Sequence, residues 1–110
     1  MHELVRLHPG AWREFRRALR WYEAEQQGLG GQLWDEMNAV LDRVAGRSLP
    51  GMSVQVELPG RTLEKVFVER FRYTVYYEWW EGLCYVWAIA HQRRRPSYWT
   101  RRTREGIRGV

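Results

Sequence analysis

Residues 71–90, FRYTVYYEWWEGLCYVWAIA, decide the fold of this 110-residue chain. Apolar or aromatic side chains occupy every odd position from Phe71 to Trp79, and this two-residue period is typical of a β-strand with one buried face. Glu81-Gly82 is a hairpin-turn sequence, and the segment 83–90 after it is apolar on both faces, as in a central strand. The stretch therefore predicts two antiparallel strands, 71–79 and 83–90, in the middle of a sheet.

The segments upstream predict more strands and a pair of helices. Residues 3–8 form a short apolar run that ends at Pro9-Gly10. Amphipathic patterns with a period near 3.6 then cover 11–27 and 32–45, and the glycine-rich break between them is short enough for an antiparallel helical hairpin. Alternating apolar residues predict the remaining strands, at 54–58 and 62–69.

Together these segments predict one α+β domain that covers residues 1–110. An N-terminal strand precedes the helical hairpin, and the hairpin packs on a curved antiparallel sheet of three to four strands. A short basic segment follows the last strand, and residues 105–110 are expected to form a frayed tail.

The net charge is concentrated at the C-terminal end. The chain has 18 Lys and Arg against 13 Asp and Glu, a formal charge of +5. Residues 1–90 hold 11 basic and 12 acidic side chains, which is −1, whereas 91–110 hold seven Arg and one Glu, which is +6. No stretch is long and apolar enough to span a membrane and the N-terminus has no signal-peptide pattern, so we expect a soluble cytoplasmic protein.

The segment HQRRRPSYWTRR, 91–102, combines clustered arginine with aromatic residues. Such surfaces bind phosphates through charge and bases through stacking. The three adjacent arginines 93–95 repel one another and predict an acidic or phosphate partner. Trp99 has two interpretations, a target contact or a hydrophobic plug over the sheet, and the plug is favoured because exposed tryptophan is uncommon.

Few residues suggest catalysis. The single cysteine, Cys84, is expected to be a small buried hydrophobe, and His91 has no nearby carboxylate or thiol in sequence, so we expect neither a metal nor a cofactor. A ribonuclease that uses the RNA 2′-hydroxyl needs only a base, an acid and cations, roles that Lys65, His91, Tyr98 and the arginine cluster could fill. The carboxylates that alternate along the predicted strands are expected to face solvent: Glu57, Glu64, Glu69 and Glu78.

Two stretches resemble the RelE/ParE superfamily of bacterial toxins from type II toxin-antitoxin modules, and the nearer match is the ParE-like branch. They are 61–78, RTLEKVFVERFRYTVYYE, and 86–102, VWAIAHQRRRPSYWTRR. The second reproduces the usual ParE-like ending, in which Ala-His is followed by a basic run, Arg-x-Pro-x-Tyr-Trp and a final Arg. The resemblance extends from about Ala11 to Arg102. It departs from the family at Arg72, where a Phe-Pro-Tyr sequence usually has its proline.

The resemblance implies a toxin that inhibits bacterial growth by binding a macromolecular target, DNA gyrase for the ParE-like branch, and that is neutralised by an antitoxin in a hetero-oligomer. The expected target-binding residues are Arg61, Arg93, Arg94, Arg95, Tyr98, Trp99 and Arg102. The expected antitoxin-binding residues are Arg16, Arg20 and Arg72.

An alternative within the superfamily is a RelE-like, ribosome-dependent mRNA endoribonuclease. Its catalytic set in this chain would be Lys65, His91, Arg94 and Tyr98, which matches the RelE pattern only in part. A third hypothesis is an inert remnant that keeps the fold and antitoxin binding.

Overall fold

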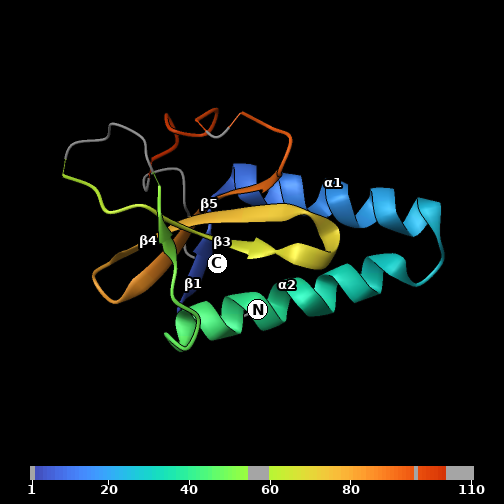
Figure 1. The fold of residues 1–110 in the computed structure, drawn as a ribbon, viewed down its shortest axis with the longest axis horizontal. Helices are drawn as coiled ribbons and strands as arrows, with labels where there is room; N and C mark the ends of the chain where they lie inside the picture. Colours follow the sequence, from blue (N-terminus) through green and yellow to red (C-terminus); the bar gives the residue numbers. More distant parts are fainter. Residues whose placement is uncertain (1, 55–59, 96, 104–110) are drawn as a thin grey trace.

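A computed structural model describes residues 2–54, 60–95 and 97–103 of the chain. Two helices pack on one face of a five-stranded sheet, so the predicted α+β fold with an N-terminal strand is confirmed (Figure 1). Most of the strand predicted at 54–58, and the tail predicted at 105–110, lie outside the described residues. In chain order the elements are β1 (Val5–Leu7), α1 (Pro9–Glu25), α2 (Leu29–Ala45), β2 (Met52–Ser53), β3 (Glu64–Val68), a 3-10 turn η1 (Glu69–Phe71), β4 (Tyr73–Trp80) and β5 (Leu83–His91).

The sheet corrects one detail of the prediction, because it has five strands and is mixed rather than antiparallel with three or four. The strand order is β1-β5-β4-β3-β2. Strand β1 runs parallel to β5, with Val5 opposite Cys84 and Leu7 opposite Val86, and the other neighbours are antiparallel. A short apolar run predicts a strand but carries no information about a partner almost eighty residues away. The pairing gives β5 neighbours on both sides, so it is a central strand as expected.

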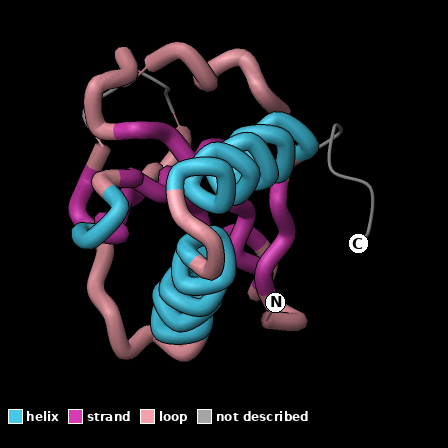
Figure 2. Tube along the Cα trace, turned by 90° about the vertical axis from the view of Figure 1, so that its right-hand side faces the viewer, coloured by secondary structure: helices cyan, strands magenta, loops and turns pink. Residues whose placement is uncertain are grey.

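Capping interactions at the start of α1 and in the loop between the helices fix the helical hairpin. Helix α1 begins at Pro9, which suits the first turn, and the Nδ1 atom of His8 accepts a hydrogen bond from the Gly10 amide at 2.9 Å. Gly28 adopts a left-handed backbone (φ 89°) between the helices, and the Glu23 carboxylate accepts hydrogen bonds from the amides of Gly28 and Gly30. Figure 2 views the molecule from the end at which this loop joins α1 to α2.

Both faces of the sheet are buried, and a bulge in β5 sets which side chains lie on the face away from the helices. Tyr76 pairs with Ala88 but Tyr77 pairs with Val86, so Trp87 is an extra residue and both Trp87 and Ala88 face away from the helices. The helix side holds the larger core, from α1, α2 and the facing strand residues. On the other side a smaller cluster contains Leu63, Tyr76, Trp87, Ala88, Ala90 and Trp99. The C-terminal segment thus packs on the face that the helices leave open.

Candidate functional site

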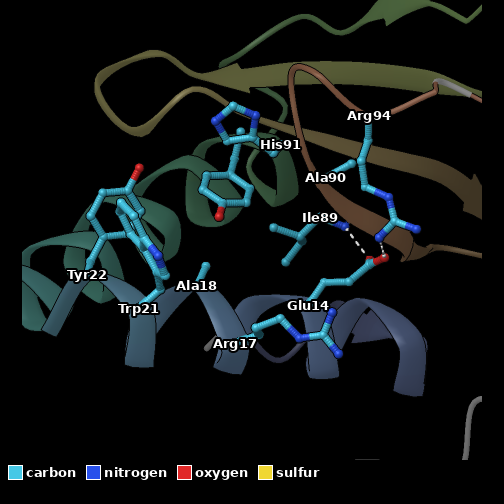
Figure 3. A pocket seen from close by; sticks show the side chains of 10 residues that line it. Glu14, Arg17, Ala18, Trp21, Tyr22, Ile89, Ala90, His91 and Arg94 are labelled. Atoms are coloured by element: carbon cyan, nitrogen blue, oxygen red, sulfur yellow. Dashed lines mark hydrogen bonds and ion pairs between the residues drawn. The ribbon is translucent and has the colours of Figure 1, made fainter. Parts of the chain in front are cut away.

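A pocket of about 350 Å³ lies between α1 and the end of β5 (Figure 3). Ala18, Ile89 and Ala90 supply small or apolar lining, and three aromatic side chains stand around them. Because Ala18 presents only a methyl group from α1, the space beside it stays open. The described residues that line it are Glu14, Arg17, Ala18, Trp21, Tyr22, Tyr73, Ile89, Ala90, His91 and Arg94.

Glu14 anchors the C-terminal segment at one end of this pocket. Its carboxylate accepts hydrogen bonds from the Ile89 amide at 3.1 Å, from both terminal nitrogens of Arg102 at 3.0 and 3.1 Å, and from the Tyr98 hydroxyl. Arg94 is more distant, with 3.9 Å between its guanidinium and Glu14, and it lies over the Tyr98 ring at 3.8 Å. Burial, and then the hydrogen bond to Glu14, raise the pKa of the Tyr98 phenol.

The same anchor closes the exposed edge of β5. Strand β1 stops at Leu7, so within the described ranges β5 has no strand partner on that side beyond Val86. There the Ile89 amide donates to Glu14, and the Trp87 carbonyl accepts from Arg102 at 2.8 Å. Gly10 permits this arrangement, because a Cβ atom at this position would lie 2.5 Å from the Arg102 guanidinium carbon. The ion pair therefore satisfies backbone groups that a longer β1 would have bound.

A second buried acid lies on the face away from the helices. Glu78 is 3% exposed, forms an ion pair with Arg61 and accepts a hydrogen bond from the Trp87 indole at 3.0 Å. The expectation that Glu78 faces solvent is wrong, because the C-terminal segment covers this side of the sheet. Glu64 is also partly buried and accepts a hydrogen bond from the Tyr77 hydroxyl at 3.0 Å. Glu69 is exposed as predicted, and Glu57 lies outside the described residues.

The four residues of the nuclease hypothesis lie in two places. His91 and Arg94 line the pocket beside α1, and the His91 ring contacts Tyr73 with 5.4 Å between ring centroids. Lys65 pairs with Tyr76 on β4, a residue of the cluster on the opposite face. Val66 and Val68 of β3 belong to the helix-side core. Successive side chains of a strand point to opposite faces, so Lys65, next to Val66, points away from the helices. The sheet lies between Lys65 and His91.

The expected binding residues also divide into buried and exposed groups. Trp99 is 1% exposed and packs on Tyr76, so its interpretation as a plug is confirmed. Arg61 and Arg102 are paired with Glu78 and Glu14. Tyr98 is partly buried and donates its hydroxyl hydrogen bond to Glu14. The other expected residues of the C-terminal segment, Arg93, Arg94 and Arg95, are exposed.

The expected antitoxin-binding residues are all exposed. Arg16 and Arg20 lie on α1, and Arg72 follows η1. Arg72 has a left-handed backbone, φ 57°, which a proline cannot adopt. The departure from the Phe-Pro-Tyr pattern therefore accompanies a turn that needs a residue other than proline.

Glu14, Arg17 and Trp21 were missed by the sequence argument as site residues. The signal that could have identified Glu14 is its charge, because between 13 and 20 it is one acidic residue among four arginines. A lone acid on a basic helix is suited to pairing with a cation from elsewhere. Nothing local marks Arg17 or Trp21, which differ from their neighbours only in facing the end of β5.

The described residues hold no group of three or more His, Cys, Asp and Glu side chains able to bind a metal ion. Cys84 is fully buried, as expected, and burial followed by the charge of Glu64 raises the pKa of its thiol to about 12. Such a thiol stays protonated and cannot act as a nucleophile at neutral pH.

Neither described helix has the length and apolar character that crossing a lipid bilayer requires. Comparisons with protein-family models, with curated proteins and with solved structures found no match to this chain.

Proposed function

We propose that this chain is the ParE-like toxin of a type II toxin-antitoxin system and that it stops bacterial growth in the cytoplasm by binding a macromolecular target, with DNA gyrase favoured by the resemblance. One observation carries the proposal. Tyr98, Trp99 and Arg102, residues of the ParE-like ending, fasten the C-terminal segment to the sheet, while the arginines 93–95 stay exposed beside it. A fastened cation cluster binds an acidic surface at a low cost in side-chain ordering.

The positions of the nuclease residues favour binding over catalysis. Lys65 and His91 lie on opposite faces of the sheet, so they cannot act on one scissile bond without rearrangement. The Tyr98 hydroxyl is occupied by Glu14, and its raised pKa disfavours the phenolate that a general base would need. A gyrase inhibitor of the ParE-like kind requires no catalytic residue.

The partner of this toxin would be an antitoxin with an acidic, amphipathic tail. Arg16, Arg20 and Arg72 are exposed, and their charges suit such a segment. A short adjacent reading frame that encodes a DNA-binding domain followed by an acidic tail would support this partner.

Tightly controlled expression in bacteria tests the function. We expect growth arrest together with altered plasmid supercoiling, and transcripts without new mapped ends. Transcript cleavage with normal supercoiling would replace gyrase inhibition by the endoribonuclease alternative. Normal growth at a verified level of folded protein would favour the inert remnant.

Arg94→Ala is the sharpest variant for the target surface. The Arg94 side chain is 53% exposed and is the most distant partner of Glu14, so its loss should leave the thermal unfolding midpoint nearly unchanged while toxicity falls at least tenfold. Arg43→Ala, which removes the same charge from the exposed surface of α2, is the matched control and should remain toxic. Full toxicity of a folded Arg94→Ala variant would remove Arg94 from the target surface.

A further inference from the structure

The pocket between α1 and β5 presents hydrogen-bond donors that the described part of the protein leaves unused. Arg17 makes no hydrogen bond or ion pair with any described residue, and neither does the Tyr73 hydroxyl. His91 Nδ1 accepts a hydrogen bond from the Arg93 amide at 3.2 Å, so the neutral ring carries its proton on Nε2. These three groups, with the half-exposed Arg94, offer donors to a ligand that is rich in acceptors.

The charge of the pocket points to an anion. Among the described residues that line the pocket, Glu14 is the one carboxylate, and Arg102 already compensates that charge at 3.0 Å. Arg17 and Arg94 then remain as two positive charges at the pocket (Figure 3). Arginine forms two parallel hydrogen bonds with a phosphate or a carboxylate, so either group would be a counterpart for these charges.

The remaining wall suits a flat ring. Trp21 is 56% exposed, and it packs edge-on to Tyr22 at 4.9 Å and 86°. An exposed indole beside arginines is the combination on which unpaired bases stack. A volume of about 350 Å³ is near the lower end of the range for small-ligand pockets, and it suits one nucleotide rather than a duplex.

We infer that this pocket binds one unpaired nucleotide of a single strand, with its phosphate at Arg17 and Arg94 and its base against Trp21. An acidic peptide would satisfy the arginines but would supply no planar group for the indole, so a nucleotide uses more of the pocket. The inference goes beyond the proposed toxin function and does not depend on it, since it concerns binding by the purified chain alone.

Titration of the purified full chain tests the site. The probes are thymidine 5′-monophosphate, the trinucleotide d(TTT), inorganic phosphate, tetraglutamate and a short DNA duplex, at one ionic strength. Calorimetry gives the affinities, and the indole N–H resonance of Trp21, assigned with Trp21→Phe, reports the place. We expect the mononucleotide and d(TTT) to shift this resonance and to bind more tightly than phosphate, tetraglutamate or the duplex.

Four variants separate the pocket from general electrostatic attraction. Arg17→Ala and Trp21→Ala change exposed side chains and should each weaken d(TTT) binding at least tenfold, whereas Arg43→Ala, on α2, removes an equal charge and should leave it unchanged. Ala18→Leu should fill the pocket and abolish binding; should it fail to fold, the two exposed variants still decide. Equal affinities in Arg17→Ala, Trp21→Ala and Arg43→Ala would overturn the inference, as would tetraglutamate, free phosphate or duplex binding as tight as d(TTT).

Discussion

The two faces of the sheet are buried by different kinds of cover. On one face lie two 17-residue helices, whose apolar stripes form a continuous core with the strands. On the other lies the short irregular segment 97–103, which supplies one large apolar side chain, Trp99, and two anchors, Tyr98 and Arg102. The helices satisfy their own backbone hydrogen bonds, whereas the segment depends on side chains that reach Glu14 on α1.

This difference concentrates the stability of the second face in a few contacts. Losing one apolar side chain from the helix face leaves many neighbours to hold the hairpin. The C-terminal segment is held by far fewer contacts, so a single substitution there should detach the segment as a unit. The exposed arginines 93–95 precede this segment, so the same few contacts limit where they can lie.

The largest effect should come from Trp99→Ala. Trp99 is 1% exposed, and removing its ring should lower the free energy of unfolding by about 4 kcal/mol in chemical denaturation. Trp21→Ala, on a side chain that is 56% exposed, is the control and should cost less than about 1 kcal/mol. The Trp99 indole N–H has no hydrogen-bond partner in the described structure, so Trp99→Phe should be much milder than Trp99→Ala. Equal losses for Trp99→Ala and Trp21→Ala would show that the segment is not part of the core.

Glu14→Gln should have the next largest effect. The substitution keeps the shape of the side chain but removes the charge that Arg102 and Tyr98 bind, and the Glu14 side chain is only 12% exposed. We expect a loss of about 2 kcal/mol in the free energy of unfolding. Hydrogen exchange should accelerate at the Thr100 and Arg102 amides, which are bonded within the segment.

The matched control for this anchor is Glu25→Gln, at the exposed end of the same helix. It should change the free energy of unfolding by less than about 0.5 kcal/mol. Unchanged exchange at Thr100 and Arg102 in Glu14→Gln would mean that the apolar contact of Trp99 alone holds the segment.

A smaller effect is expected at alkaline pH. The folded chain raises the pKa of Tyr98 above the usual value of 10, so the unfolded chain loses this proton first and stability falls as pH rises above about 10. Tyr98→Phe should cost about 1 kcal/mol at pH 7 through the lost hydrogen bond, and should then lose less stability than the parent between pH 9 and 11. Tyr85→Phe is the control, since the Tyr85 hydroxyl bonds to no described residue. Parallel pH curves for the parent and Tyr98→Phe would contradict the raised pKa of Tyr98, and with it the burial and the Glu14 hydrogen bond that cause it.

The strongly periodic segments were predictable because their signals are local. The strands expected at 71–79 and 83–90 correspond to Tyr73–Trp80 and Leu83–His91, and the turn between them falls at Glu81-Gly82. The parallel pairing of β1 and the contact of Glu14 with Ile89 join residues more than seventy positions apart, and no local pattern carries that information.

Glu78 shows a second limit of periodicity. Its position between apolar odd residues correctly assigns it to the face away from the helices. The pattern cannot tell whether that face is later covered, and the segment 97–103 with Arg61 makes it a buried site. The pocket beside Ala18 could not be predicted from local periodicity either, since its walls come from α1, β4 and β5 together.

The smallest expected effect is that of His8→Asn, at the residue that caps α1 beside the second face. Burial, followed by the charges of Arg102 and Arg13, lowers the pKa of His8, so the unfolded chain binds the proton first and stability falls as pH drops below about 6.5. His8→Asn keeps an acceptor for the Gly10 amide and should be nearly neutral at pH 7, with a shallower loss between pH 7 and 5 in thermal unfolding. His8→Ala removes the cap as well and should cost about 1 kcal/mol at pH 7. If His8→Asn follows the parent's acid curve, folding does not lower the pKa of His8, and neither its burial nor the charge of Arg102 acts on this cap.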